Sequence, residues 1–149
     1  MQHIPAGYHS VTPYIVGRGV AHLIEFLKTA FDAQEIERMA RPDGSIGHAE
    51  VKIGDSIIMM ADANEKFGPM PTNIYLYVKD TDAAYKRALA SGAISLMEPA
   101  DQFYGDRNAG VKDSLGNFWW IGTHIEDVPA DELKRRAEAW GKQQAGHSR

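Results

Sequence analysis

The spacing of apolar residues changes along the chain and predicts which segments form helices and which form strands. Apolar side chains recur every three or four residues from Val20 to Phe31, as on a helix with one buried face. A second helix is expected from Asp80 or Asp82 to about Gly92. Runs rich in β-branched and aromatic residues between turn residues predict eight strands: Val11–Val16, Glu35–Ala40, Ile46–Ile53, Ile57–Asp62, Asn73–Val78, Ile94–Glu98, Tyr104–Lys112 and Phe118–Thr123.

The predicted elements form the same series twice. Each half reads strand, helix, strand, strand, strand, and a shift of about 61 positions superposes the halves. We therefore expect a single domain over residues 1–149, made of repeats 8–62 and 73–128 with a helical tail over 129–149. The last residues, Gln143–Arg149, are expected to fray. The alternative is a chance agreement of two short α/β segments.

Composition narrows the possible partners. The chain has 149 residues, a net charge of −4 and no cysteine. Basic residues are scattered, which argues against nucleic acid as a partner. No apolar run approaches 18 residues, so we expect no membrane span. The N-terminal segment lacks the pattern of a signal peptide, and a cytoplasmic protein is the default expectation.

Several segments of the chain are similar to those of one known superfamily. Ile46-Gly47-His48-Ala49-Glu50 and Asp113-Ser114-Leu115-Gly116-Asn117-Phe118-Trp119 carry the similarity, with Phe103–Arg107 and Thr123–Val128. With the repeat, these segments resemble the vicinal oxygen chelate superfamily, which includes glyoxalase I, extradiol dioxygenases and bleomycin-binding proteins, and within it the PhnB-like branch. The resemblance implies an α+β fold of two tandem βαβββ modules with curled, mostly antiparallel half-barrel sheets and a C-terminal helix.

The resemblance also implies where a metal would bind. In the enzymes of this superfamily, the first and last strands of each unit supply His and Glu ligands to a divalent ion. The matching positions here are Thr12, Met59, Asn73 and Trp120, and none is His, Asp or Glu. Divalent ions need carboxylate oxygens or imidazole nitrogens. We therefore expect no metal and no cofactor.

Alternation along the strands predicts what the concave face carries instead. Neighbouring strand residues point to opposite faces, so Trp120 faces the concave side when Trp119 faces the helices. An aromatic wall with a few polar anchors is typical of a small-molecule pocket. The alternative is that this face closes on itself as a second core. The predicted lining comprises Thr12, Tyr14, Met59, Asn73, Tyr75, Phe118 and Trp120.

Three further residues are candidates for the ligand site. His48 and Glu50 lie two apart on one strand and share a face, where they could bind a relocated metal or act as a base with its orienting carboxylate. The alternative is a solvated edge pair. Arg107 could clamp an anion, or form a surface ion pair or a contact across subunits. We expect His124 to be a structural hydrogen-bonding residue.

The predicted function is that of a metal-free protein that binds a planar or apolar small molecule. The alternative is a divalent-metal-dependent lyase or isomerase, or a dioxygenase-like enzyme, of the same superfamily with relocated ligands. A third possibility is a scaffold in which dimerisation is the purpose. A homodimer is expected in each case, because the resembled proteins often complete their sites across subunits.

Overall fold

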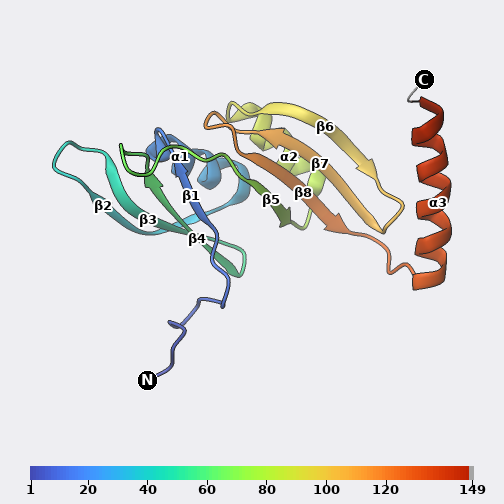
Figure 1. The fold of residues 1–149 in the computed structure, drawn as a ribbon, viewed down its shortest axis with the longest axis horizontal. Helices are drawn as coiled ribbons and strands as arrows, with labels where there is room; N and C mark the ends of the chain where they lie inside the picture. The colour runs from blue at the N-terminus through green and yellow to red at the C-terminus, as the bar shows by residue number, and fades with distance from the viewer. Residues whose placement is uncertain (148–149) are drawn as a thin grey trace.

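The structure is a computed structural model that describes residues 1–147, and its elements follow the predicted series (Figure 1). The first module contains β1 (Tyr14–Gly17), α1 (Val20–Phe31), β2 (Gln34–Ala40), β3 (Ile46–Ile53) and β4 (Ser56–Asp62). The second module contains β5 (Asn73–Tyr77), α2 (Thr81–Ala90), β6 (Ile94–Asp101), β7 (Asp106–Lys112) and β8 (Phe118–His124). A last helix, α3 (Ala130–His147), follows the second module.

The two modules have the same sheet topology. The strand order is β1-β4-β3-β2 in one sheet and β5-β8-β7-β6 in the other, and in each the first strand runs parallel to the last. Tyr14 pairs with Met59 in the first sheet, and Tyr75 pairs with Trp120 in the second. Both pairs are related by the 61-residue shift. The α+β fold of two tandem βαβββ units is therefore confirmed, and the two sheets agree with the 61-residue shift.

The core lies on the helix side of both sheets. Trp119, Ile15 and Met60 are at most 1% exposed there, among the side chains of α1 and α2. The indole Nε1 of Trp119 donates to the buried Asp113 at 2.8 Å, so its one polar group is satisfied. The alternating partners of these residues point to the opposite side of each sheet, which we call the open face.

Two aspartates fix the starts of the module helices. Asp62 at the end of β4 accepts from the backbone N–H groups of Gly19 and Val20, where α1 begins, and of Ile46, where β3 begins. Burial of Asp62 opposes its ionisation, but these three N–H donors hold its pKa below the ordinary value. Asp80 caps α2 by accepting from the N–H of Ala83.

Some predicted boundaries are wrong. Strand β1 begins at Tyr14 rather than Val11, so Thr12 precedes the strand. Pro13 has no N–H to donate to a ladder, although its carbonyl accepts from the N–H of Met59. Strand β6 continues to Asp101, and β7 begins at Asp106, because residues 103–105 form a turn.

Helix α3 stands apart from the two sheets, beyond the turn that joins β6 to β7 (Figure 1). Arg136 ties it to the second module through Glu126, at 2.8 and 3.0 Å, and through the carbonyl of Phe103. The predicted fraying from Gln143 is wrong as far as His147, since the helix continues to that residue, and positions 148 and 149 lie outside the described residues. Across residues 1–147, no helix is both long and apolar enough to cross a membrane.

Candidate functional site

The open faces carry exposed aromatic rings. Tyr14 on β1 is 50% exposed, and Tyr75 and Tyr77 on β5 are 41% and 62% exposed. Met59 and Trp120, the strand partners of Tyr14 and Tyr75, are half-buried. The alternative that this face closes into a second core is therefore wrong for the single chain, because its rings remain accessible to solvent.

Trp120 lies flat on the open face of the second sheet. A Cβ on Gly110 of β7 would come within 2.5 Å of the indole Cζ3, so the ring occupies the space that this glycine leaves. The indole Nε1 donates to Oδ1 of Asn73 at 3.1 Å. Phe118 meets the indole edge to face at 6.1 Å between centroids. The structure thus brings together three of the predicted lining residues.

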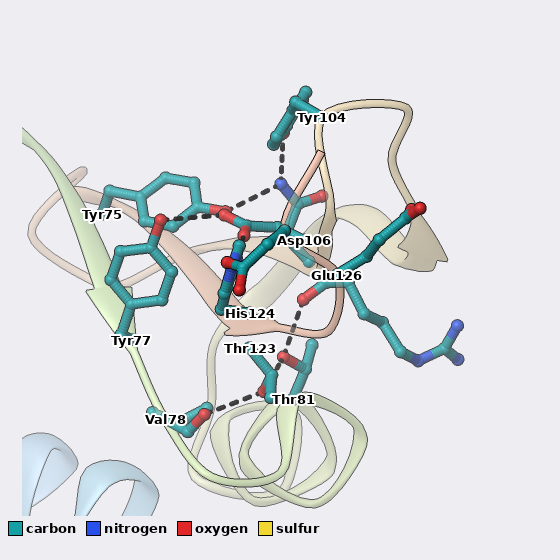
Figure 2. A network of polar contacts seen from close by, with 12 residues as sticks. Tyr75, Tyr77, Val78, Thr81, Tyr104, Asp106, Thr123, His124 and Glu126 are labelled. Carbon is teal, nitrogen blue, oxygen red and sulfur yellow. Dashed lines mark hydrogen bonds and ion pairs between the residues drawn. The ribbon is translucent and has the colours of Figure 1, made fainter. Parts of the chain in front are cut away.

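Tyr75 is the strand neighbour of Trp120. Its hydroxyl lies in a polar cluster with Tyr77, Asp106 and His124 (Figure 2). Its ring lies over Gly122, where a Cβ would meet the Tyr75 hydroxyl at 2.6 Å. The hydroxyls of Tyr75 and Tyr77 both donate to Oδ2 of Asp106, at 2.7 and 2.9 Å. His124 approaches the other carboxylate oxygen through Nδ1 at 3.0 Å.

The electrostatics of this cluster follow from its hydrogen bonds. Burial of Asp106 opposes ionisation, but the bonds from His124, Tyr75 and Tyr77 leave its pKa below the ordinary value. The bonds of His124 to Asp127 and Asp106 raise the imidazole pKa. Burial and the Asp106 carboxylate raise the pKa of Tyr75, and the same carboxylate raises that of Tyr77. The cluster therefore favours charged Asp106 and neutral tyrosines.

Sequence reasoning did not single out Asn108 of this cluster, and it considered Asp106 only as a possible partner of Arg107 in a surface ion pair. Asn108 is buried on β7 and donates through Nδ2 to the hydroxyls of Tyr75, at 3.1 Å, and Tyr104, at 2.6 Å. Asp106, two positions earlier, is also buried. Polar residues on one face of an inner strand were a signal that could have identified both, because buried polar groups require partners. His124 is the hydrogen-bonding residue that we predicted.

A second cluster lies on the open face of the first sheet. Nε2 of His48 is 2.7 Å from one carboxylate oxygen of Glu50, and Nδ1 is 3.2 Å from the hydroxyl of Tyr14. The other oxygen of Glu50 accepts from the hydroxyl of Tyr8. Glu50 is only 6% exposed, because β3 is an inner strand of its sheet. The interpretation of His48 and Glu50 as a solvated edge pair is therefore wrong.

Two hollows adjoin the predicted lining. One of about 330 Å³ lies between the N-terminal segment and the first sheet, with Tyr8, Thr12 and Met59 in its wall. Another of about 360 Å³ lies between the modules and is lined by Thr12 and Tyr75. Thr12 thus contributes to both, although it lies outside strand β1. A wider groove of about 1130 Å³ between the modules reaches Tyr77 and His124.

Arg107 is not brought together with the other predicted residues. Its guanidinium makes a bidentate pair with Asp82 of α2, at 2.7 and 2.8 Å, and also contacts Asp101 at 3.0 Å. These three residues lie beside the helix, whereas the neighbouring Asp106 belongs to the open face. Of the alternatives for Arg107, the structure shows an intramolecular ion pair.

Four positions match the superfamily's metal ligands, and we call them the metal slots: Thr12, Met59, Asn73 and Trp120. Their side chains do not suit a divalent ion. Met59 offers a thioether and Thr12 a hydroxyl, which are poor ligands for such ions. In the second module, the Asn73 carbonyl oxygen accepts from the Trp120 indole, so these two slots are bonded to each other. Across residues 1–147, no group of three or more His, Asp or Glu side chains is arranged to hold a metal. The side chains in these slots therefore do not fit the superfamily's metal.

Two tandem βαβββ modules with an aromatic open face define the class of this protein. Residues 8–121 match the family model of the Glyoxalase/Bleomycin resistance protein/Dioxygenase superfamily. The uncharacterized protein Mb0911c of Mycobacterium bovis is 32% identical over 143 residues, which cover 89% of this chain and 94% of that protein. The chain belongs to the glyoxalase/bleomycin resistance protein/dioxygenase superfamily, also called the vicinal oxygen chelate superfamily.

Solved structures share the fold at lower identity. TioX from Micromonospora sp. ML1 superposes with a TM-score of 0.63 at 22% identity, over 78% of this chain and all of that one. The PhnB protein from Bacillus cereus gives a TM-score of 0.60 at 16% identity, over 77% of this chain and 99% of that one. The predicted likeness to PhnB-like proteins is therefore confirmed at the level of the fold, an architecture that supports many activities.

Proposed function

We propose that this protein binds a planar or apolar small molecule on its open faces without a metal. The observation that carries the proposal is the Trp120 indole, which lies flat on the sheet in a metal slot and is fixed there by Asn73. A ring held in this way is a stacking surface. Nearby Tyr75, half-exposed, continues that surface.

The energetics suit a small aromatic ligand. A stacked pair of rings contributes about 0.5–1.5 kcal/mol beyond the apolar area that it buries. Two such contacts with Trp120 and Tyr75, together with burial of apolar area, would support micromolar binding, which corresponds to about 8 kcal/mol. Thr12 lines both hollows and supplies a hydroxyl that can orient the ligand. The predicted role of Arg107 is less well supported, because its donors face Asp82 and Asp101.

We also propose that the protein is a homodimer whose partner copy covers the open faces. The chain exposes 9581 Å², whereas a folded monomer of 16.5 kDa exposes about 7,600 Å². The excess of about 2,000 Å² exceeds the roughly 800 Å² per partner of a standard interface. Exposed apolar residues on β2 and β6, such as Met39 and Ile94, also support a partner. Two copies could then enclose one ligand between their aromatic walls.

A melting-temperature screen tests the ligand proposal. Planar aromatic compounds at 1,000 times their Kd should stabilise the protein by about 4 kcal/mol, which is a shift in Tm of about 8–16 °C. Ni²⁺, Zn²⁺ and Mn²⁺ form the second arm and should give no shift. A hit should lose its shift in Trp120→Ala and keep it in Trp140→Ala, which removes a half-exposed indole of α3 that packs on Phe103.

Two results would contradict the proposed metal-free ligand site, each in a different way. A hit that stabilises Trp120→Ala as much as the natural protein would place the ligand elsewhere. One tightly held metal ion per chain, lost when His48 and Glu50 are both replaced by Ala, would favour the alternative of a metal-dependent lyase or isomerase with relocated ligands. The side chains of His48 and Glu50 are 2.7 Å apart, and this contact is the observation that favours the metal-dependent alternative.

A further inference from the structure

The open face of the first module contains a hydrogen-bonded chain that ligand stacking does not require. It starts at the hydroxyl of Tyr14, which is half exposed, and passes through both ring nitrogens of His48 to Glu50. Glu50 is buried, and its second oxygen accepts from Tyr8. The chain therefore connects a hydroxyl at the surface with a buried carboxylate.

The chemistry of the groups fixes the direction of the hydrogen bonds. A carboxylate only accepts, so the proton of the imidazole lies on Nε2 and points to Glu50. Nδ1 then carries a lone pair, and it faces the hydroxyl of Tyr14 at 3.2 Å. A hydroxyl next to a base that is oriented by a third group is the arrangement that activates a nucleophile, and such contacts are often loose before substrate binds.

We propose that Tyr14, His48 and Glu50 form a metal-free acyl-transfer site that accepts activated esters of small carboxylic acids. The Tyr14 oxygen attacks the ester carbonyl carbon and forms a C–O bond, while its proton passes to Nδ1 of His48. The bond to the leaving alcohol breaks, and the alcohol takes that proton. Water then cleaves the acyl-tyrosine by the same proton route, releasing the acid and restoring the hydroxyl.

A hollow lies next to the strand neighbour of Tyr14. Met59 is the strand partner of both Tyr14 and Glu50, and it lines the hollow of about 330 Å³. Tyr8 lines the same hollow. Tyr14 is the catalytic nucleophile and His48 the general base, whereas Glu50 is a positioning residue that sets the tautomer of the imidazole.

The second module shows what the same tyrosine position does without a base. Tyr75 is related to Tyr14 by the 61-residue shift, but its hydroxyl donates directly to the carboxylate of Asp106. This contact and burial raise the pKa of Tyr75, which makes its phenol harder to ionise. The first module thus differs in that an imidazole nitrogen, rather than a carboxylate oxygen, faces the tyrosine hydroxyl.

The test is acetylation by 4-nitrophenyl acetate, followed by release of nitrophenolate and by peptide mapping of the modified residue. We expect an initial burst with acetyl on Tyr14, at a rate at least about 100-fold above that in His48→Gln, since a positioned base contributes about 10²–10⁴-fold. Tyr14→Phe should abolish the burst. Tyr85→Phe is the matched control and should keep it, because the Tyr85 hydroxyl donates to that of Ser95 rather than to an imidazole.

Glu50→Gln provides a readout that a structural role would not change. The amide can donate to Nε2 and so place the imidazole proton on Nδ1, which removes the lone pair that faces Tyr14. The acetylation rate at Tyr14 in Glu50→Gln should then fall to that in His48→Gln, and its pH profile should differ from that of the natural protein.

Two outcomes would overturn the acyl-transfer site. One is acetylation of Tyr14 no faster than that of Tyr85, and the other is a rate in His48→Gln equal to that of the natural protein. The acyl-transfer site lies on the open face that also carries the proposed ligand surface, but acyl transfer does not require that a planar ligand binds. The melting-temperature screen on the natural protein separates them, because a hit that Trp120→Ala abolishes leaves ligand binding intact when acetylation fails.

Discussion

Gly110 of β7 provides the sharpest test of the aromatic wall, because it has no side chain beneath the Trp120 ring. In Gly110→Ala, the new Cβ would lie 2.5, 2.7 and 3.4 Å from indole Cζ3, Cε3 and Cη2. Ordinary contacts begin near 3.4 Å. The ring must therefore rise by about 1 Å or swing away. Either movement breaks the 3.1 Å hydrogen bond to Asn73.

The magnitude can be worked out term by term. Exposure of about 50 Å² of apolar area costs about 1.2 kcal/mol, and loss of the hydrogen bond costs about 1 kcal/mol. Alanine in a strand gains about 0.7 kcal/mol over glycine through the entropy of the unfolded chain. The net loss is about 1.5 kcal/mol, which lowers Tm by about 3–6 °C in a domain of this size.

Thermal unfolding and tryptophan fluorescence measure the two consequences. Gly141→Ala in α3, where nothing lies within 4 Å of the new Cβ, is the control and should be neutral or slightly stabilising. The double variant Gly110→Ala/Trp120→Ala should show the alanine at position 110 no longer destabilising, since the clashing ring is gone. A Gly110→Ala protein with unchanged Tm and unchanged emission would refute the flat placement of Trp120.

Two further predictions concern assembly and pH. Sedimentation at tens of micromolar (about the working range) should show a dimer, because of the excess surface of about 2,000 Å², and a monomer would contradict the proposed partner copy. Asp106→Asn should lower the free energy of unfolding by about 2 kcal/mol at pH 6, since several hydrogen bonds to a charged group are lost. The Asp106 pKa is lowered in the folded state, so its contribution is present above the ordinary range near 4 and disappears below it. The His124 pKa is raised, so its contribution is present below the ordinary imidazole range and disappears as pH rises through the raised value. Denaturant unfolding at pH 3, 6 and 9 should therefore show the largest difference between natural protein and variant at pH 6, and an equal difference at all three values would contradict the assignment.

The local pattern of apolar and polar residues was sufficient to predict the helices and strands and the faces of the two adjacent tryptophans. The period of two placed Trp119 in the core and Trp120 on the open face, because a strand leaves no other choice once one of them is buried. The 61-residue repeat matched positions of the two halves, and the structure pairs them alike, Tyr14 with Met59 and Tyr75 with Trp120. Pro13 shows the limit of pattern, since the β-rich run around it gave a strand that begins three residues too early.

The contacts of the candidate site depended on sheet order and side-chain direction. The hydroxyl of Tyr75 meets Asp106, which is 31 positions away, only because β8 lies between β5 and β7 and Gly122 leaves room for the ring to cross. Arg107, one residue further along, points to α2 and meets Asp82. No local spacing encodes either partner.

The sequence by itself determined the repeated fold, the face of each strand residue and the lack of metal-ligating side chains in the four slots. These properties follow from chain period and residue chemistry, which are the same in any packing of the strands. Only the tertiary structure decided that Tyr8 reaches Glu50 and that His48 lies between Glu50 and Tyr14. The contacts of Tyr8 with Glu50 and of Tyr14 with His48 join residues 42 and 34 positions apart, and they form only after the strands are ordered and the buried polar groups have found partners.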